Sequence, residues 1–591
     1  MSILIKTVRV AGFRGLENLQ IDLEQTTVLT GMNNTGKTSL LKAMQVALGN
    51  RQFISPDDFF IRDNSNCDQI TIDLLIVPVN ENGNESDDFT EDWEVLLTTD
   101  RIRTDGIKSF VPLRTICTLD PITSSSKIQQ FILSDWPEFK DNNKDWFQHD
   151  NGNKTRFHFD EIPFFYMDAQ RDIMEDTKQR SSYLGKMLSN IEYSAEDIEE
   201  IEEQIKLLNE KAVNSSDILS NIKDTLKDLD SAMGSQSHGI EITPFTKKIR
   251  DLNKGLSIYY GDSKDSFSME YHGMGTRSWS SLLTLKSFIN QLASHAEKEG
   301  AVFFPMLAIE EPEAHLHPNA QKKLFGQINA ISGQKIISTH SPYIAATAEL
   351  NQIRNFYKNE KVYCGRIKID NLSSEDIRKI KRQVISSRGE IFFSRLIVFF
   401  EGETEEQALP IFAQKYFGRS HVEMGLDFVG VGGYKSYLPF VRFAEDLSIP
   451  WLIFSDAEAD TKQWVSKLHE KCNTTKTLSD VVVYLNDDND FERQLIADGF
   501  QDEIKACILD FDEYSNEQHR AAKEPARQQE VSNYSDDDLY NIITDEKTKY
   551  GPAVADKIIE GNKDLPPKLI ALFDRIKYTL NLEGLQHDFS N

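Results

Sequence analysis

A glycine-rich loop near the start of the chain limits its fold more than any other feature. Residues 31–38 read Gly-Met-Asn-Asn-Thr-Gly-Lys-Thr, which fits the pattern G-x-x-x-x-G-K-[ST]. The apolar run 27–30 precedes this loop, and residues 39–48 have the apolar spacing of a helix. Residues 3–10 alternate apolar and polar side chains as an edge strand does. A glycine loop between a strand and a helix predicts an α/β domain that binds the phosphates of a nucleotide.

The residues of this loop have separate expected roles in holding ATP. Backbone N–H groups and the helix N-terminus surround phosphate oxygens, Lys37 reaches the β and γ phosphates, and Thr38 ligates Mg²⁺. A chance glycine turn is the alternative, and the flanking strand and helix argue against it. The residues expected to bind ATP here are Gly31, Asn33, Asn34, Thr35, Gly36, Lys37, Thr38 and Ser39.

An apolar strand far downstream ends in two adjacent carboxylates. Residues 301–309 lead into Glu310 and Glu311, within the sequence E-E-P-E-A-H-L-H-P. One carboxylate of such a pair orients the Mg²⁺ shell and the other positions the attacking water, so we assign Glu310 to the metal and Glu311 to the water. His315 and His317 have no cysteine partner nearby, and we expect them in a turn rather than in a zinc site.

A second strand with acidic residues at its end occupies residues 396–400. It runs directly into Glu401-Gly402-Glu403-Thr404-Glu405. Gly402 permits a tight turn, so Glu401 is expected at the end of the strand and Glu405 in the first turn of the next helix. Both carboxylates then reach one metal ion. The alternative is that they are ordinary surface carboxylates in a chain that holds 94 acidic residues.

Further carboxylates follow two later strands. Asp456 and Glu458 come after the apolar run 450–455, and alternate positions point the same way; Asp460 is an alternative to the second of them. Glu492 follows the next apolar strand. Hard oxygen ligands in this number suit Mg²⁺ or Mn²⁺. Two such ions activate water and stabilise the leaving oxygen of a phosphodiester.

Composition narrows the class of protein. The 591 residues exceed the about 250–300 that one core usually supports, so two or three domains are expected. Five scattered cysteines without a C-x-x-C pair argue against a disulfide framework and favour a reducing, cytoplasmic setting. No apolar run approaches the roughly 18–20 residues of a membrane helix. The net charge of -28 repels nucleic acid, so any DNA contact must be local or helped by metal.

The nucleotide motifs resemble those of ABC-type ATPases of the chromosome-maintenance and DNA-repair branch, including the overcoming-lysogenisation-defect (OLD) family. The resemblance rests on E-E-P-E-A-H-L-H-P, on the strand 335–342 and on the segment 272–278. It implies that His340 senses the γ-phosphate as a switch histidine. It also implies that Gly273 and Gly275 belong to a divergent signature motif, which contacts nucleotide across a dimer, so that two ATPase heads must meet.

The strand followed by E-G-x-T-E resembles the Toprim domain of topoisomerases, primases and OLD-family nucleases. In Toprim proteins a D-x-D after a later strand binds divalent metal, which corresponds to Asp456 and Glu458 here. Residues 546–551 resemble the segment whose lysine OLD-type nucleases place beside the scissile phosphate. Lys547 fits that spacing, with Lys549 as the alternative. A topoisomerase needs a tyrosine nucleophile in a dedicated domain and a primase needs polymerase-associated modules, and neither is identified in the sequence.

The resemblance covers nearly the whole chain and implies an α/β fold, an ABC-type ATPase head with a helical insertion followed by a Toprim (Rossmann-like) domain. Isoleucines at 198, 201 and 205 form a stripe typical of a helix-pair seam, so the insertion is expected to mediate dimerisation. Basic residues crowd the segment before the Toprim strand, which is either a local DNA contact or a solvated helix face or linker. The expected parts are the N-terminal ATPase part (1–171), the helical insertion (172–260), the C-terminal ATPase part (261–375), a basic linker (376–395) and the Toprim nuclease domain (396–591).

The resemblance implies an ATP-regulated, metal-dependent DNA endonuclease of the class found in antiphage systems such as Gabija. The expected cofactors are ATP and Mg²⁺ or Mn²⁺. The expected partners are DNA, further copies in a homodimer or homotetramer, and a helicase or other defence-system protein, with no membrane. The alternative is an ATP-sensing assembly module with an inactive Toprim domain, since Glu310 and Glu458 stand where relatives have Asp. The motifs leave open the substrate sequence and whether ATP activates or inhibits cleavage.

Overall fold

The computed structural model contains two compact units, residues 1–159 with 334–591 and residues 160–333. No described helix combines the length and apolar character that crossing a bilayer requires. The described residues run from 2 to 582 with these gaps: 63–64, 81–82, 120–125, 140–144, 149–151, 179–181, 183–185, 187–193, 221–258, 261–266, 370–371, 386–387, 473, 475, 516 and 562.

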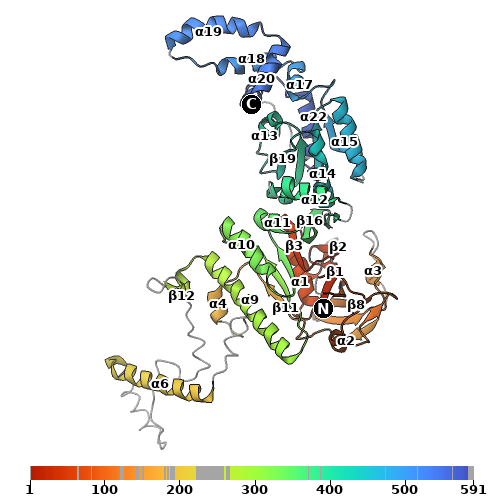
Figure 1. Cartoon of the computed structure of the whole chain (residues 1–591), viewed down its shortest axis with the longest axis vertical. Coiled ribbons are helices and arrows are strands. Elements are labelled where there is room, and N and C mark those ends of the chain that lie inside the picture. Colours follow the sequence, from red (N-terminus) through yellow and green to blue (C-terminus); the bar gives the residue numbers. More distant parts are fainter. Residues whose placement is uncertain are drawn as a thin grey trace, which may run out of the picture. The chain divides into compact units, whose positions relative to one another are not determined.

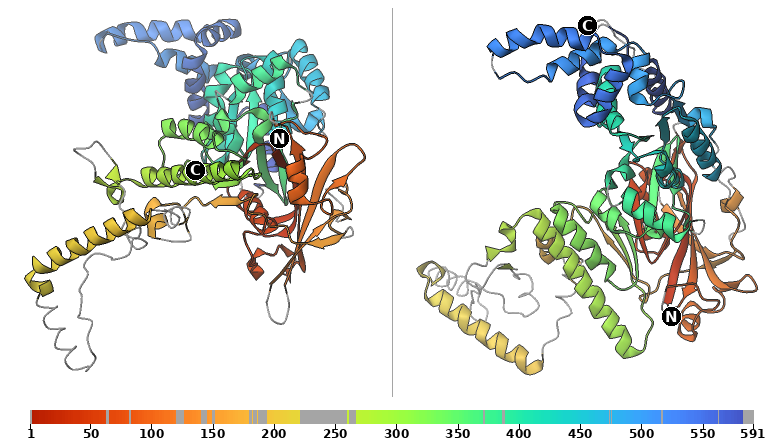
Figure 2. Two further views of the ribbon diagram at one scale, coloured as in Figure 1. Left: turned by 60° about the horizontal axis from the view of Figure 1, so that its bottom comes forward. Right: turned by 45° about the horizontal axis from the view of Figure 1, so that its top comes forward.

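The first unit opens with an antiparallel sheet (Figure 2, red to orange strands). The order of its strands is β10 (Asn153–Thr155), β9 (Ser126–Ile132), β8 (Ser109–Leu119), β6 (Gln69–Val79), β1 (Ser2–Phe13) and β2 (Leu16–Asp22). A short strand, β7 (Arg103–Thr104), pairs with β8. The prediction of an edge strand at residues 3–10 is wrong, because β1 pairs with both β2 and β6 and is buried along most of its length. The strand also continues through Gly12, whose φ is +74°. A side chain there would meet the carbonyl oxygen of Gln69 at 2.6 Å.

The nucleotide loop of the first unit follows strand β3 (Thr26–Gly31) of a second sheet. The strands of this sheet within the first unit are, in order, β15 (Gln334–Ser338), β3, β16 (Ile353–Asn359) and β17 (Lys361–Gly365). β3 is buried throughout and pairs in parallel with β15 and β16. Helix α1 (Lys37–Ala47) follows the loop and buries Leu40, Leu41 and Met44. The predicted order of strand, glycine loop and helix is therefore confirmed.

The second unit holds a parallel strand pair and several helices (Figure 2, yellow to green). The pair is β11 (Phe164–Met167) with β14 (Met306–Glu310). Within helix α6 (Ala195–Asn214), Ile205 is buried and Ile198 is 37% exposed, while residues 221–258 of the expected insertion lie outside the described residues. The other elements of the unit are α4 (Ile173–Lys178), α6 (Ala195–Asn214), β12 (Tyr259–Tyr260), β13 (Phe267–Ser268), α9 (Met274–Glu299) and α10 (Pro318–Asn329).

A four-stranded parallel sheet forms the later part of the first unit (Figure 1), in the order β19 (Leu426–Gly430), β18 (Leu396–Phe400), β20 (Trp451–Ser455) and β21 (Val482–Tyr484). β18 is apolar and fully buried because it is an interior strand of this sheet. The helices of this part are α13 (Glu403–Phe417), α14 (Tyr437–Asp446), α15 (Ala459–Lys471), α16 (Leu478–Val481), α17 (Phe491–Ala497), α18 (Gln501–Asp510), α19 (Glu517–Ser532), α20 (Asp536–Asp545), α21 (Lys547–Glu560) and α22 (Pro567–Thr579).

The segment expected as a basic linker at 376–395 is instead a chain of short helices packed into the first unit. Ile380, Val384 and Phe392 are buried, and the Phe392 ring lies 5.0 Å from that of Phe443. Arg378, Lys379 and Arg382 remain exposed on these helices, so the basic residues lie on a solvated helix face while the apolar ones pack inward. The segment contains α12 (Ser374–Lys379), a π-helix (Ile380–Ile385) and a 3-10 helix (Gly389–Phe393). Short elements elsewhere in the first unit are β4 (Ile61–Arg62), β5 (Ser65–Asn66), α2 (Glu91–Leu97), α3 (Asp145–Gln148) and α11 (Pro342–Thr347).

Candidate functional site

The connections of the parallel sheet favour a ligand site between β18 and β20. These strands are neighbours, yet β18 is followed by β19 on one side and β20 by β21 on the other. Open α/β sheets bind ligands outside the carboxyl ends of their strands, where the strand order reverses in this way. Glu401 directly follows β18 and Asp456 directly follows β20. The fold therefore brings two predicted metal ligands to the position where such sheets bind ligands.

Glu401 is held in place by donors from neighbouring elements. Its Oε1 accepts hydrogen bonds from Ser455 Oγ at 2.8 Å and from Tyr437 Oη at 3.4 Å. The backbone N–H groups of Asp456 and Tyr434 also donate to this carboxylate, and burial raises its pKa above the usual range. The carboxylate is thus oriented before any ligand arrives.

Two further carboxyl groups lie deeper in the site. Burial first, and then the charge of Glu492, raises the pKa of Glu405 to about 8. Burial and the charges of Glu405 and Glu401 raise the pKa of Asp456 to about 8. A side chain at position 402 would meet Glu405 Oε2 at 2.6 Å, so Glu405 would have to move if position 402 carried a side chain.

Glu492 and Lys547 form an ion pair at the same site. Lys547 Nζ lies 2.9 Å from Glu492 Oε1, which also accepts a hydrogen bond from Thr404 Oγ1 at 2.5 Å. Burial opposes the charge on Lys547, yet the bond to Glu492 prevails and raises the lysine pKa. Lys549 points elsewhere, because its ammonium pairs with Glu546 at 2.7 Å. The geometry therefore separates the two lysines that the sequence left as alternatives.

Not every predicted ligand joins this group. Glu458 is exposed at the start of α15, and Asp460 is exposed in its first turn. The acidic residues whose charges act on Asp456 are instead Glu405, Glu401, Asp490 and Glu492. Asp490 accepts a hydrogen bond from Tyr540 Oη at 2.6 Å.

Four residues of this site were not predicted from the sequence, although two of them have a visible signal. Thr404 lies inside the E-G-x-T-E pattern, and Ser455 directly precedes Asp456. Asp490 has no signal of its own beyond its place two positions before Glu492. Tyr437 had no signal, because it reaches Glu401 from α14 through the fold alone.

The oxygen atoms at this site fit a divalent cation. Asp456 Oδ1 is buried and receives no hydrogen bond from the described residues, which is costly for a carboxylate unless a cation binds it. Within the described part of the chain, no three acidic, His or Cys side chains already enclose a metal position. The side-chain donors that the described residues offer to Glu401 and Glu492 all contact Oε1, so the second oxygen of each carboxylate is available to a cation.

Protonation of Glu405 and Asp456 leads to a prediction about stability. Both have a folded pKa of about 8, whereas carboxyl groups in an unfolded chain ionise near pH 4. The metal-free folded state binds the extra protons, so the contribution of these two groups to stability is largest below about pH 4 and is lost as pH rises toward about 8. We expect the melting temperature of the chelator-treated protein to fall over this range, measured by thermal unfolding. Adding Mg²⁺ or Mn²⁺ should recover more stability at the upper end.

The control is Glu405→Gln with Asp456→Asn, which cannot lose these protons. Its melting temperature should depend less on pH than that of the wild type. An equal pH dependence in both proteins would contradict the assignment of these pKa values.

The two neighbouring lysines allow a matched comparison. Lys547→Ala should lower DNA cleavage on the order of a hundredfold, because one cation that offsets developing charge contributes about that much. Lys549→Ala should stay close to the wild type, since Lys549 contacts Glu546 at the surface. The measurement is the initial rate of plasmid cleavage. Equal losses in the two variants would contradict a special role for Lys547.

The glycine loop forms a second candidate site in the first unit. Gly31, Asn34 and Gly36 all have positive φ, so the backbone bends sharply around the loop. Lys37 Nζ donates to the carbonyl oxygens of Gly31 and Met32, both at 2.7 Å. Burial and the charge of Lys37 lower the pKa of His340 to about 4, so its imidazole is neutral near pH 7. Thr38 and Ser39 occupy the first turn of α1.

The carboxylate pair Glu310 and Glu311 lies in the second unit. Glu310 Oε1 accepts a hydrogen bond from Tyr166 Oη at 2.7 Å. Arg171 donates to the carbonyl oxygens of Glu310 and Pro312, at 3.2 and 2.7 Å. Glu311 is exposed and has a φ of 42°, which is uncommon for a residue other than glycine. Neither Tyr166 nor Arg171 had a sequence signal.

The predicted signature glycines also lie in the second unit, at the start of α9. Gly273 is the residue before the helix, and Gly275 lies in its first turn. A side chain at Gly275 would meet the carbonyl oxygen of His315 at 2.4 Å, so the helix approaches the turn after the carboxylate pair. His317 caps α10 by accepting a hydrogen bond from the Asn319 N–H at 3.3 Å. Both histidines thus lie in a turn and at a helix end.

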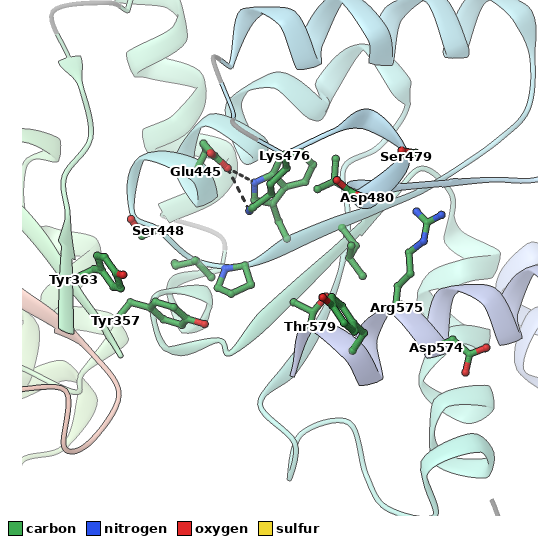
Figure 3. A pocket seen from close by; sticks show the side chains of 16 residues that line it. Tyr357, Tyr363, Glu445, Ser448, Lys476, Ser479, Asp480, Asp574, Arg575 and Thr579 are labelled. Atoms are coloured by element: carbon green, nitrogen blue, oxygen red, sulfur yellow. Dashed lines mark hydrogen bonds and ion pairs between the residues drawn. The ribbon is translucent and has the colours of Figure 1, made fainter. Parts of the chain in front are cut away.

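A wide cavity of about 1170 Å³ lies beside the amino end of β20 in the parallel sheet (Figure 3). Pro450 and Trp451, at the amino end of β20, line it. Figure 3 shows Tyr357 and Tyr363 on one side of this cavity and Arg575 on the other. The predicted metal ligands follow the carboxyl ends of the strands, so this cavity is separate from the carboxylate site.

Comparison with known proteins decides the family. The family described as "AAA ATPase domain" matches residues 4–345, which is more than half of the chain. The chain belongs to this ATPase family. Residues 392–457 match the family described as "Overcoming lysogenization defect protein-like, TOPRIM domain". The predicted fold class and the resemblance to OLD-family proteins are thereby confirmed, and the chain combines an ATPase with a nuclease.

Two relatives of the chain carry nuclease names. The "OLD nuclease" of Thermus scotoductus is 24% identical over 489 residues, which cover 77% of this chain and 82% of that protein. The "Endonuclease GajA" of Bacillus cereus is 23% identical over 249 residues, 36% of this chain and 35% of that protein. The solved C-terminal region of the Burkholderia pseudomallei OLD protein is 17% identical with a TM-score of 0.24, and the match covers 32% of this chain and 99% of that one.

Proposed function

We propose that this ATPase-linked nuclease is a metal-dependent DNA endonuclease that is regulated by ATP and acts in antiphage defence. The observation that carries the proposal is the meeting of Glu401, Glu405, Asp456, Glu492 and Lys547 at the switch point of the parallel sheet. Similarity to the OLD nuclease and to the endonuclease GajA supports the cleavage reaction. The defence role is proposed from the resemblance of the motifs to the class found in antiphage systems.

In the proposed reaction, Glu401, Glu405 and Asp456 hold Mg²⁺ or Mn²⁺, with Glu492 and the exposed Glu458 as further ligands. Bound divalent ions would supply Lewis acidity and an activated water at this site. Ser455 and Tyr437 keep Glu401 oriented toward the strand ends. Lys547 lies beside the carboxylates and offsets the negative charge that develops on the phosphate.

For the ATPase, we propose that Lys37 and Thr38 hold the nucleotide and its metal, while His340 senses the γ-phosphate. Glu310 completes the metal shell and Glu311 positions the attacking water. Gly31, Asn33, Asn34, Thr35, Gly36 and Ser39 complete the phosphate loop, and Gly273 and Gly275 reach the nucleotide of a second head.

We also propose that paired heads assemble a homodimer or homotetramer. In this proposal residues 1–171 and 261–375 make the ATPase head, residues 172–260 the dimerising insertion, and residues 396–591 the nuclease domain. A helicase or other defence-system protein is the proposed further partner.

The test is cleavage of supercoiled and linear DNA by purified protein, with and without ATP. We expect cleavage in Mg²⁺ or Mn²⁺ that disappears in chelator and returns when the metal is restored. A change of rate on adding ATP gives the sign of nucleotide control. Cleavage that continues in chelator would contradict metal dependence, and no cleavage under any condition would favour the assembly-module alternative.

A further inference from the structure

A basic cavity lies in the early part of the first unit, within residues 46–158. Its volume is about 410 Å³, inside the range of about 300–1,000 Å³ that is typical of ligand pockets. Its lining includes Arg51, Lys154, Arg156 and His158, and none of the described residues that line it is acidic. In a chain with 94 acidic and 66 basic residues, such a lining is unexpected for an ordinary patch of surface.

The backbone presents three of these side chains on one face. Lys154, Arg156 and His158 are exposed, whereas Phe157 between them is 1% exposed. All three side chains line the cavity, in β10 and in the residues that follow it. The cavity therefore has a row of three nitrogen-bearing side chains along one wall.

Neighbouring elements hold this row in a fixed position. Gln130 on β9 accepts a hydrogen bond from the Phe157 N–H at 2.7 Å, and its Nε2 donates to the carbonyl oxygen of Ala47 at 2.8 Å. The rings of Phe157 and Phe159 pack edge to face with centroids 5.0 Å apart. The His158 ring lies over Gly49, where an added Cβ would be 3.3 Å from Nδ1. The cavity is thus preorganised by the end of α1 and by β9.

The charges of the row are not neutralised within the described part of the chain. Arg51 pairs with Asp58 at 2.6 Å and so has a structural partner, but Lys154 and Arg156 make no ion pair with any described residue. Elsewhere in the same part of the fold, Lys6 and Lys108 both pair with Glu85. Exposed cations in a preformed, acid-free cavity favour an anion as the occupant.

We propose that this cavity binds phosphate groups of the DNA backbone and anchors the substrate away from the carboxylate site. The inference rests on the proposed function, because it takes DNA as the substrate. Arginine matches phosphate with paired N–H groups, and lysine adds a point charge. The carboxylate site offers a single lysine, Lys547, so an acidic chain needs further local cations elsewhere to hold the DNA backbone.

The test is DNA binding by the full-length Asp456→Asn protein, in which cleavage does not disturb the measurement. Adding Lys154→Gln and Arg156→Gln should weaken binding of a short duplex by about tenfold near 0.1 M salt, and should reduce the salt slope by about 1.8 for two lost phosphate contacts. Lys154→Arg with Arg156→Lys should retain binding. The matched control is Lys6→Gln with Lys108→Gln, which removes two charges from lysines that are already paired.

The outcomes separate this inference from the proposed function. Unchanged DNA affinity in the Lys154→Gln, Arg156→Gln protein, or equal weakening in the control, would overturn the anchoring site. If that protein keeps its DNA affinity but loses calorimetric binding of inorganic phosphate, the cavity holds a free phosphate and the DNA assignment is overturned. DNA cleavage is measured separately, in proteins that keep Asp456. A protein that binds DNA through this cavity but never cleaves it would refute the nuclease proposal and leave the anchoring site intact.

Discussion

Replacing Asp456 by Asn is expected to lower DNA cleavage by at least about a thousandfold, because a lost metal contact removes several kcal/mol of stabilisation from the transition state. Asp456 directly follows β20, and its Oδ1 is buried without a hydrogen-bond donor among the described residues. The substitution keeps the shape of the side chain and removes its charge. Since the change also removes the repulsion from Glu405 and Glu401, the metal-free variant should melt at a higher temperature near pH 8.

Three comparisons make this prediction specific. Glu401→Ala should show a similar loss of cleavage, because Glu401 lies at the same strand ends. Glu403→Ala is the matched control, since Glu403 is exposed on the first turn of α13 and takes no part in the site. ATP hydrolysis should remain near the wild-type rate in all three variants. Cleavage that survives Glu401→Ala combined with Asp456→Asn would sink the assignment of the nuclease site.

Replacing Lys37 by Ala is expected to lower ATP hydrolysis by about a hundredfold or more, as loss of a positioned phosphate contact does. Lys37 Nζ is the ammonium within reach of the loop carbonyls of Gly31 and Met32, and its charge acts on His340. Without it, neither the β nor the γ phosphate has its principal cation. The measurements are the rate of phosphate release and the rate of DNA cleavage with and without ATP.

Comparing DNA cleavage by the wild type and by the Lys37→Ala protein, both in the presence of ATP, shows whether ATP activates or inhibits cleavage. We expect cleavage to lose its response to ATP, because a ligand changes an equilibrium only through a difference in binding. Lys42→Ala, on the same helix but outside the loop, is the control and should keep both activities. ATP hydrolysis at the wild-type rate in Lys37→Ala would contradict the assignment of this loop.

Residue types and their spacing predicted the local structure around both sites. The strand before Gly31, the helix after it, and the apolar strands before Glu401 and Asp456 all occur where the sequence placed them. The reason is that buried parallel strands are short apolar runs, and turns need glycine at defined positions. Local patterns of this kind extend over only a few residues and do not depend on the rest of the chain.

Errors arose where a prediction depended on what packs beside a segment. Residues 3–10 alternate as an edge strand does, but β6 arrives from 60 residues away and covers the open edge. The basic side chains of residues 376–395 indicate a solvated face, but their charge does not predict that Ile380 and Phe392 are buried against other elements. Alternation and charge describe a segment alone, whereas burial depends on its neighbours.

By itself, the sequence determined the family of motifs, the order of the ATPase and Toprim parts, and the carboxylates available at each strand end. Only the tertiary structure decided which of them meet. It brought Lys547 to Glu492 across 55 positions of the chain and directed Lys549 away to Glu546. It also gathered Lys154, Arg156 and His158 beside the end of α1. The physical reason is that a site is defined by distances of a few ångströms between side chains, and packing of distant segments sets those distances.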